Sequence, residues 1–182
     1  MPFDLPPKES LTVEFKSDRP LADRDLAAAV VALANTEGGD LYLGVEDDGR
    51  LTGLHPNHAN LNGLAAFIAA RTNPGLAVRV TRLEIGGIAV ARINVPKSRQ
   101  LVSTSDGLMQ RRRLMSDGTP EAIPFYPHEF VQRQSAMGLM DPAATLIEEV
   151  SAEELDQLQR LRIRNAVKKY GGEQSLLALE DD

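Results

Sequence analysis

Alternating and helical spacings of apolar residues predict a strand, a helix and a second strand near the start of the chain. Alternation over residues 11–17 predicts the first strand, whose odd-numbered positions face a core and whose even-numbered positions face the other way. Residues 21–39 carry apolar side chains at helical spacing, with Gly38 as a natural C-terminal stop. Alternation returns over residues 40–45, and an Asp-Gly pair predicts a tight turn into a returning strand over 50–54.

The clearest hairpin of the sequence lies over residues 76–96 and turns at Gly86-Gly87. If Ile85 pairs with Ile88, four polar residues share one face of this ribbon at its far end. These residues are Arg79, Thr81, Arg92 and Asn94. The sequence therefore predicts a small basic surface on a rigid pair of strands.

Three further segments complete the first part of the chain. Residues 58–72 predict a second amphipathic helix, and residues 127–137 predict a short closing helix. Between them, residues 100–114 predict a pair of short strands around an Asp-Gly turn, with Arg112 facing opposite to its two Arg neighbours. Together these patterns predict an α+β domain over residues 1–138, in which helices flank a mixed, largely antiparallel sheet.

The composition changes after residue 138. Leucines at helical spacing predict a C-terminal amphipathic helix within residues 151–172, which ends at a Gly-Gly pair. We therefore expect residues 139–182 to form a linker and a helical connector that leads to a further domain. The apolar stripe of this helix, which comprises Leu155, Leu158 and Leu161, raises the hypothesis of a homodimer, in which the chain would be a sensing or protein-interaction module.

The composition also excludes several classes of site. The 182 residues include no Cys, which excludes disulfides, thiolate metal sites and a Cys nucleophile. No apolar run approaches the roughly 20 residues that cross a bilayer, and the N-terminus lacks the features of a secretory signal. We therefore expect a cytoplasmic protein with no membrane partner. Aromatic residues make up only 4% of the chain, so a stacking platform for single-stranded bases is poorly supplied.

Charge is unevenly distributed along the chain. The formal net charge of −6 counts against nucleic acid as a partner. Residues 79–113 nevertheless carry eight Lys and Arg residues against two acidic residues, whereas the chain from residue 141 onward carries ten acidic and five basic residues. A local positive field can bind phosphate on a net acidic molecule, and an unevenly charged solvated surface is the alternative.

Four segments resemble, in the same order, the Schlafen AlbA_2-type domain, a family also described as DNA-binding or as a divergent AAA domain. They are ESLTVEFK (9–16), ALANTEGGDLYLGVEDDGRLTGL (32–54), LMQRRR (108–113) and YPHEF (126–130). The resemblance covers roughly residues 9–135. It implies a domain that binds DNA or RNA within a bacterial, RecG-like transcriptional regulator, in which the connector leads to a winged-helix region.

The resemblance also implies a metal site. In nuclease members of the family, three carboxylates hold a divalent metal and cut RNA, and the matching residues are Glu9, Glu14 and Asp47. Mg²⁺ or Mn²⁺ suits oxygen ligands, and Lys16 would neutralise a nearby phosphate. However, a five-residue separation places Glu9 and Glu14 on opposite faces of a regular strand. Asp47 lies beside an Asp-Gly turn, where an Asp is expected for structural reasons alone. An endonuclease that acts on RNA rather than DNA is therefore the alternative function.

The resemblance favours contacts between the basic residues and the phosphate backbone of a nucleic acid. These residues are Arg79, Arg92, Arg111, Arg112 and Arg113. A charged edge strand that discourages aggregation is the competing interpretation. ATP is not expected as a ligand, because neither phosphate-loop nor dinucleotide-binding glycine motif occurs. Residues 35–39 are interpreted as structural, since Asn and Gly tolerate the backbone conformations that end a helix.

Overall fold

The protein is described by a computed structural model in which residues 5–19, 21–58, 60–136, 138 and 156–171 are placed. The chain divides into two compact units, residues 1–140 and residues 141–182. The first unit contains the sheet and all but one of the helices that the structure describes.

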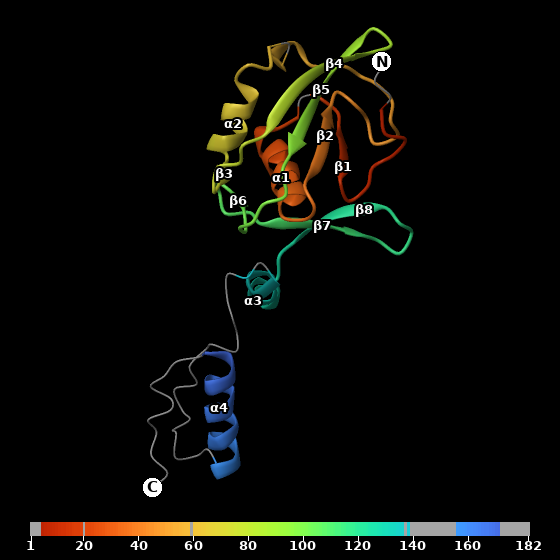
Figure 1. Cartoon of the computed structure of the whole chain (residues 1–182). Coiled ribbons are helices and arrows are strands. Elements are labelled where there is room, and N and C mark those ends of the chain that lie inside the picture. Colours follow the sequence, from red (N-terminus) through yellow and green to blue (C-terminus); the bar gives the residue numbers. More distant parts are fainter. Residues whose placement is uncertain (1–4, 20, 59, 137, 139–155, 172–182) are drawn as a thin grey trace. The chain divides into compact units, whose positions relative to one another are not determined.

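A four-stranded sheet forms the centre of the first unit (Figure 1). Its order is β1 (Val13–Lys16), β2 (Gly39–Leu43), β5 (Ile88–Val95) and β4 (Arg79–Ile85). β1 and β2 are parallel because the helix α1 (Asp23–Ala34) connects them, and the other two pairs are antiparallel. The predicted α+β class, with a mixed and largely antiparallel sheet, is confirmed.

Both faces of this sheet are covered by apolar side chains. On one face, α1 packs its buried residues against Leu41, Leu43 and Ile93. On the other face, a smaller cluster contains Phe15, Tyr42, Val45 and Val90, and the rings of Phe15 and Tyr42 meet edge to face. Glu14 of β1, which was predicted to face away from a core, lies opposite Leu41 on the face that carries α1 and is itself buried.

Residues 44–54 differ from the predicted hairpin. Gly44 has a φ of +94°, and its carbonyl accepts the N–H groups of both Thr52 and Gly53. This break moves Val45 to the same face as Tyr42, and only a single bridge joins Val45 to Leu51. The prediction of a returning strand over 50–54 is thus wrong, because β2 already has β1 and β5 as neighbours.

The predicted hairpin over residues 76–96 is confirmed as β4 and β5. Ile85 lies opposite Ile88 across the Gly86-Gly87 turn, as the sequence predicts. At the far end of the ribbon, Arg79 lies opposite Asn94 and Thr81 lies opposite Arg92. The small polar surface therefore has the predicted register.

Two pairs of short strands replace the one that was predicted over residues 100–114. β6 (Ser103–Thr104) pairs with β3 (Thr72–Asn73), whereas β7 (Gln110–Leu114) pairs with β8 (Pro120–Pro124). The turn that makes the hairpin is therefore the second Asp-Gly pair of this region, at Asp117-Gly118. The first Asp-Gly pair does not join paired strands.

The helices are shorter than their patterns predict. In place of one helix over 58–72, the structure has a single 3-10 turn, η1 (Pro56–His58), and the helix α2 (Leu64–Ala70). The closing helix is α3 (Pro127–Ala136). No helix in the described residues is long and apolar enough to cross a membrane.

The second unit contains the predicted amphipathic helix, α4 (Gln157–Tyr170). A capping box starts the helix, in which the Asp156 side chain accepts the Gln159 N–H and the Gln159 side chain accepts the Asp156 N–H. Gly171, with a left-handed backbone, ends it. Leu158 and Leu161 are 55% and 53% exposed, and Leu155 lies outside the described residues.

Candidate functional site

The side chains between α1 and β2 bind the main chain of segments that lie far along the sequence. The Asn35 side chain is buried, accepts the Val102 N–H at 2.9 Å, and donates to the carbonyls of Val102 and Gln110 at 2.8 and 2.9 Å. The Thr36 hydroxyl accepts the main-chain N–H of Arg112 at 2.7 Å. These bonds dock the segments before and within β7 onto the end of α1, so the structural interpretation of this junction agrees with its geometry.

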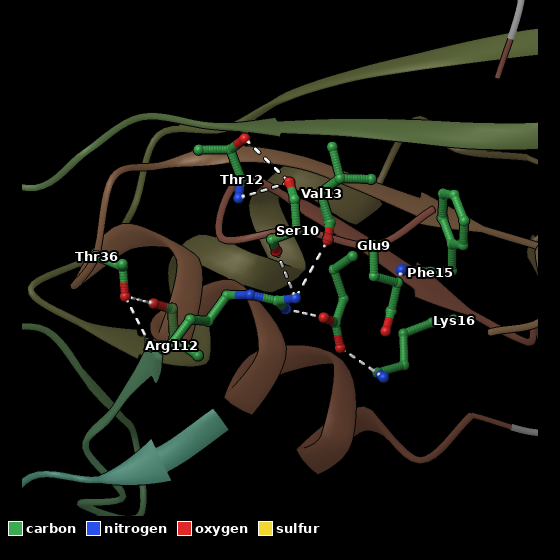
Figure 2. A network of polar contacts seen from close by, with 10 residues as sticks. Glu9, Ser10, Thr12, Val13, Phe15, Lys16, Thr36 and Arg112 are labelled. Atoms are coloured by element: carbon green, nitrogen blue, oxygen red, sulfur yellow. Dashed lines mark hydrogen bonds and ion pairs between the residues drawn. The ribbon is translucent and has the colours of Figure 1, made fainter. Parts of the chain in front are cut away.

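Arg112 points from β7 into the fold rather than toward solvent. The residue is only 4% exposed. Its guanidinium donates to the carbonyls of Ser10 and Val13 at 2.8 and 3.2 Å, and it forms an ion pair with Glu14 (Figure 2). Arg112 can therefore reach a phosphate of a bound nucleic acid only by giving up these partners.

Glu14 lies between two cations. The carboxylate is 8% exposed, and its Oε2 faces Arg112 while its Oε1 lies 2.6 Å from the Lys16 Nζ. Lys16, the residue assigned to phosphate neutralisation by the resemblance, is thus engaged by Glu14. Burial lowers the pKa of the Arg112 guanidinium, and the negative charge of Glu9 opposes this shift.

Glu9 and Asp47 do not complete a metal site with Glu14. The Glu9 Oε1 accepts the main-chain N–H of Phe15 at 2.8 Å, which fixes the bend before β1. Asp47 is exposed in the tight turn between Glu46 and Arg50. Across the part of the chain that the structure describes, no three His, Cys, Asp or Glu side chains form a group that could hold a metal ion. The donor set therefore does not fit Mg²⁺ or Mn²⁺.

Asp40 organises the polar face at the end of β5. Its two carboxylate oxygens accept hydrogen bonds from the Arg92 guanidinium at 2.7 Å and from the Asn94 amide at 2.8 Å. The hydrogen bond to Asp40 raises the pKa of Arg92. Arg79, opposite Asn94 on β4, is exposed. This arrangement holds Arg92 and Asn94 in fixed positions on the sheet, and no sequence pattern indicates this role of Asp40.

Two more cations follow directly after β5. The Lys97 Nζ lies 2.8 Å from the Glu37 carboxylate, and this pair lowers the pKa of Glu37. Arg99 is exposed, and it lines an open cleft of 610 Å³ together with Lys97 and Arg133. Lys97 and Arg99 belong to the basic run noted in the sequence, but that run alone does not distinguish them from Arg111 or Arg112.

Arg111 and Arg113 lie on the outward side of β7, as the alternation predicts. Arg111 forms an ion pair with Glu129 of α3, and its guanidinium lies 6.0 Å from the centre of the Phe125 ring. Arg113 is exposed and lies 3.3 Å from Glu121, its direct neighbour on β8. Arg111 therefore joins α3 to the hairpin, whereas Arg113 stays accessible at the surface.

Comparisons with known proteins relate the chain to a family and to two solved structures. A crystal structure of the DIP2311 protein from Corynebacterium diphtheriae is 22% identical, with a TM-score of 0.56 over 90% of this chain and 30% of that protein. This chain thus spans less than a third of that protein's length, and the likeness shows the fold alone. The solution structure of the N-terminal domain of a RecG-related protein from Nitrosomonas europaea is 24% identical, with a TM-score of 0.46 over 66% of this chain and 88% of that domain.

The family assignment is independent of these structural likenesses. No curated protein matches the sequence. The profile of the family described as Schlafen, AlbA_2 matches residues 9–118, which include β1 to β7 of the first unit and the whole network around Arg112. Because this match covers more than half of the sequence, the chain belongs to the Schlafen AlbA_2 family.

Proposed function

We propose that this chain is a nucleic-acid-binding domain, one part of a cytoplasmic bacterial transcriptional regulator, which contacts mainly backbone phosphates. The contacts would come from four residues around the end of β5, here named the sheet-end cations. They are Arg79, Arg92, Lys97 and Arg99. Arg113 on the exposed side of β7 would add a further contact.

The observation that carries this proposal is the concentration of accessible cations at one end of the sheet. Arg79 lies beside the end of β5, and Lys97 and Arg99 follow that strand directly. A cluster of positive side chains attracts phosphate even on a molecule with net negative charge. Arg111 and Arg112 carry the same charge but are engaged within the fold, so we assign them structural roles.

Asp40 supports the same proposal through preorganisation. Its carboxylate fixes Arg92 by a hydrogen bond of 2.7 Å, yet the Arg92 side chain remains 37% exposed. A guanidinium that is already oriented loses less conformational entropy when a phosphate binds. Arg92 can therefore keep its bond to Asp40 and still offer its exposed edge to an anion.

The test is binding of labelled single-stranded and double-stranded RNA and DNA, measured by fluorescence anisotropy at several salt concentrations. We expect the logarithm of the affinity to fall linearly with the logarithm of the salt concentration. Arg79→Ala and Arg99→Ala should each weaken binding about equally for all sequences, and each should reduce the salt slope by about one.

Arg82→Ala is the matched control. Arg82 lies on the same strand as Arg79, three positions later and hence on the other face, within 3.9 Å of Glu84. The substitution removes the same charge but should leave the affinity nearly unchanged. Absence of salt-dependent binding would overturn the proposal, as would an equal loss of affinity in Arg79→Ala and Arg82→Ala.

A further inference from the structure

We infer that Arg112 is the resident cation of the Glu9 and Glu14 carboxylates and that it keeps divalent metal away from them. The family resemblance implies a metal held by these two residues with Asp47. The structure places a guanidinium at Glu14 instead, so the carboxylate site has a structural use that is independent of the proposed binding surface.

The main chain and the side chain of Arg112 are both fixed. Thr36 accepts its main-chain N–H, and the carbonyls of Ser10 and Val13 accept from its guanidinium (Figure 2). The charge-assisted pair with Glu14 adds the strongest of these contacts. Three of these four contacts come from residues before and in β1, and the fourth comes from Thr36, just after α1. A cation held in this way is part of the fold rather than a movable surface group.

The carboxylate oxygens at this place already have partners. Both oxygens of Glu14 face a cation, one from Arg112 and the other from Lys16, and an oxygen of Glu9 accepts the Phe15 N–H. Mg²⁺ needs six oxygen ligands in a nearly octahedral arrangement. A divalent ion at Glu14 would have to displace Lys16 or Arg112, and it would then face the repulsion of the charge that remained.

The exchange of a metal for a guanidinium changes what the site can do. A metal lowers the pKa of a bound water and makes it a nucleophile. A guanidinium supplies fixed positive charge and directed hydrogen bonds only. Glu14 and Arg112 therefore tie the β7–β8 hairpin to β1, and any nuclease activity of this chain does not come from Glu9, Glu14 and Asp47.

The first measurement is Mn²⁺ binding to the whole chain, followed by the electron paramagnetic resonance signal of free Mn²⁺, with Glu14→Gln beside it. We expect no stoichiometric loss of the free signal with either protein. Binding of one Mn²⁺ by the unaltered chain that disappears in Glu14→Gln would overturn the inference. Mn²⁺-dependent cleavage of RNA that is lost in Glu14→Gln would overturn it equally.

The second measurement is a double-mutant cycle on stability, with Glu14→Gln, Arg112→Gln and the double variant. Each single variant should lower the thermal midpoint strongly because it removes the Arg112–Glu14 ion pair and leaves the other buried charge in place, and the double variant should lower it by clearly less than the sum. The control cycle uses Glu121→Gln and Arg113→Gln, an exposed pair on the same hairpin, which should show almost no coupling. Equal coupling in the two cycles would show that Arg112 is no internal counter-ion.

Discussion

Gly39 is the residue at which the start of β2 comes closest to β1. Its φ is +136°, and a Cβ at this position would lie 2.0 Å from the Thr12 carbonyl oxygen. That carbonyl accepts the N–H of Asp40 at 2.8 Å, so the contact belongs to the ladder between the two strands. A side chain therefore fits here only if β1 and β2 separate.

We predict that Gly39→Ala destabilises the domain by more than about 4 kcal/mol, which is beyond the usual range for a single substitution. Gly118→Ala is the control, because Gly118 also has a positive φ of +81° but open space around it. There the cost should be only the backbone strain of about 1–2 kcal/mol. Urea unfolding measures both values, and similar losses would contradict the steric explanation.

For single residues, the sequence predicts the backbone conformation better than it predicts the hydrogen-bond partners of the side chain. The Asn-Thr-Glu-Gly-Gly segment was correctly interpreted as structural, because Asn and Gly suit the end of a helix. The partners of Asn35 are Val102 and Gln110, which lie 67 and 75 positions further along the chain. Alternation likewise separated Arg112 from its neighbours, but only the packing of β7 on α1 shows that its side of the strand is buried.

Among the elements, α3 depends on a carboxylate with a perturbed pKa. The N–H of Tyr126 and the guanidinium of Arg111 both lower the pKa of Glu129 from its ordinary value of 4.5. The ionised form is thus favoured in the folded state. The stabilisation is present above the ordinary pKa and is lost as the pH falls through the lower, folded-state value.

We predict that the backbone amide signals of α3 lose their folded chemical shifts on acidification before those of β2 and β5. Glu129→Gln should weaken α3 at neutral pH, because it removes the negative charge that pairs with Arg111. It should also make the α3 signals less sensitive to pH, because the amide can still accept the Tyr126 N–H but does not titrate. Nuclear magnetic resonance between about pH 6 and 3 measures this. An unchanged acid response in Glu129→Gln would exclude this carboxylate as the cause.

The hairpins show why some elements were predictable and others were not. The β4–β5 register follows from a two-residue glycine turn between two long alternating segments. Residues 100–124 instead contain two Asp-Gly pairs, and local turn chemistry ranks them equally. The first does not form the hairpin, because β6 pairs with β3, a strand formed some thirty positions earlier in the chain. The pairing of β6 with a strand so distant in the sequence cannot be recognised from the residues around the turn.

For the whole molecule, the positions of the two apolar clusters in the sequence indicate where the chain can be shortened. All residues of both apolar clusters lie before residue 103, and α3 ends at Ala136. A chain ending at residue 140 should therefore unfold within about 2 °C of the full chain's midpoint, since it keeps both clusters and α3. A chain ending at residue 126, which lacks α3, is the control and should unfold at a lower temperature.

The same shortened chain tests the homodimer hypothesis. If Leu158 and Leu161 on α4 pair two copies, sedimentation should show a dimer for the full chain and a monomer for residues 1–140. A monomer in both cases would leave α4 as a connector. A dimer in both cases would place the contact on the first unit.

The position of Arg112 also bears on how this protein behaves at high concentration. β1 is an outer strand of the sheet, and the carbonyl of Val13 lies on the side away from β2, where it accepts the N–H of Ser10. Open strand edges of this kind recruit strands from other molecules and start fibrils. Because the guanidinium of Arg112 also donates to that carbonyl and to the carbonyl of Ser10, a buried side chain helps to close this edge of the sheet to strands from other molecules.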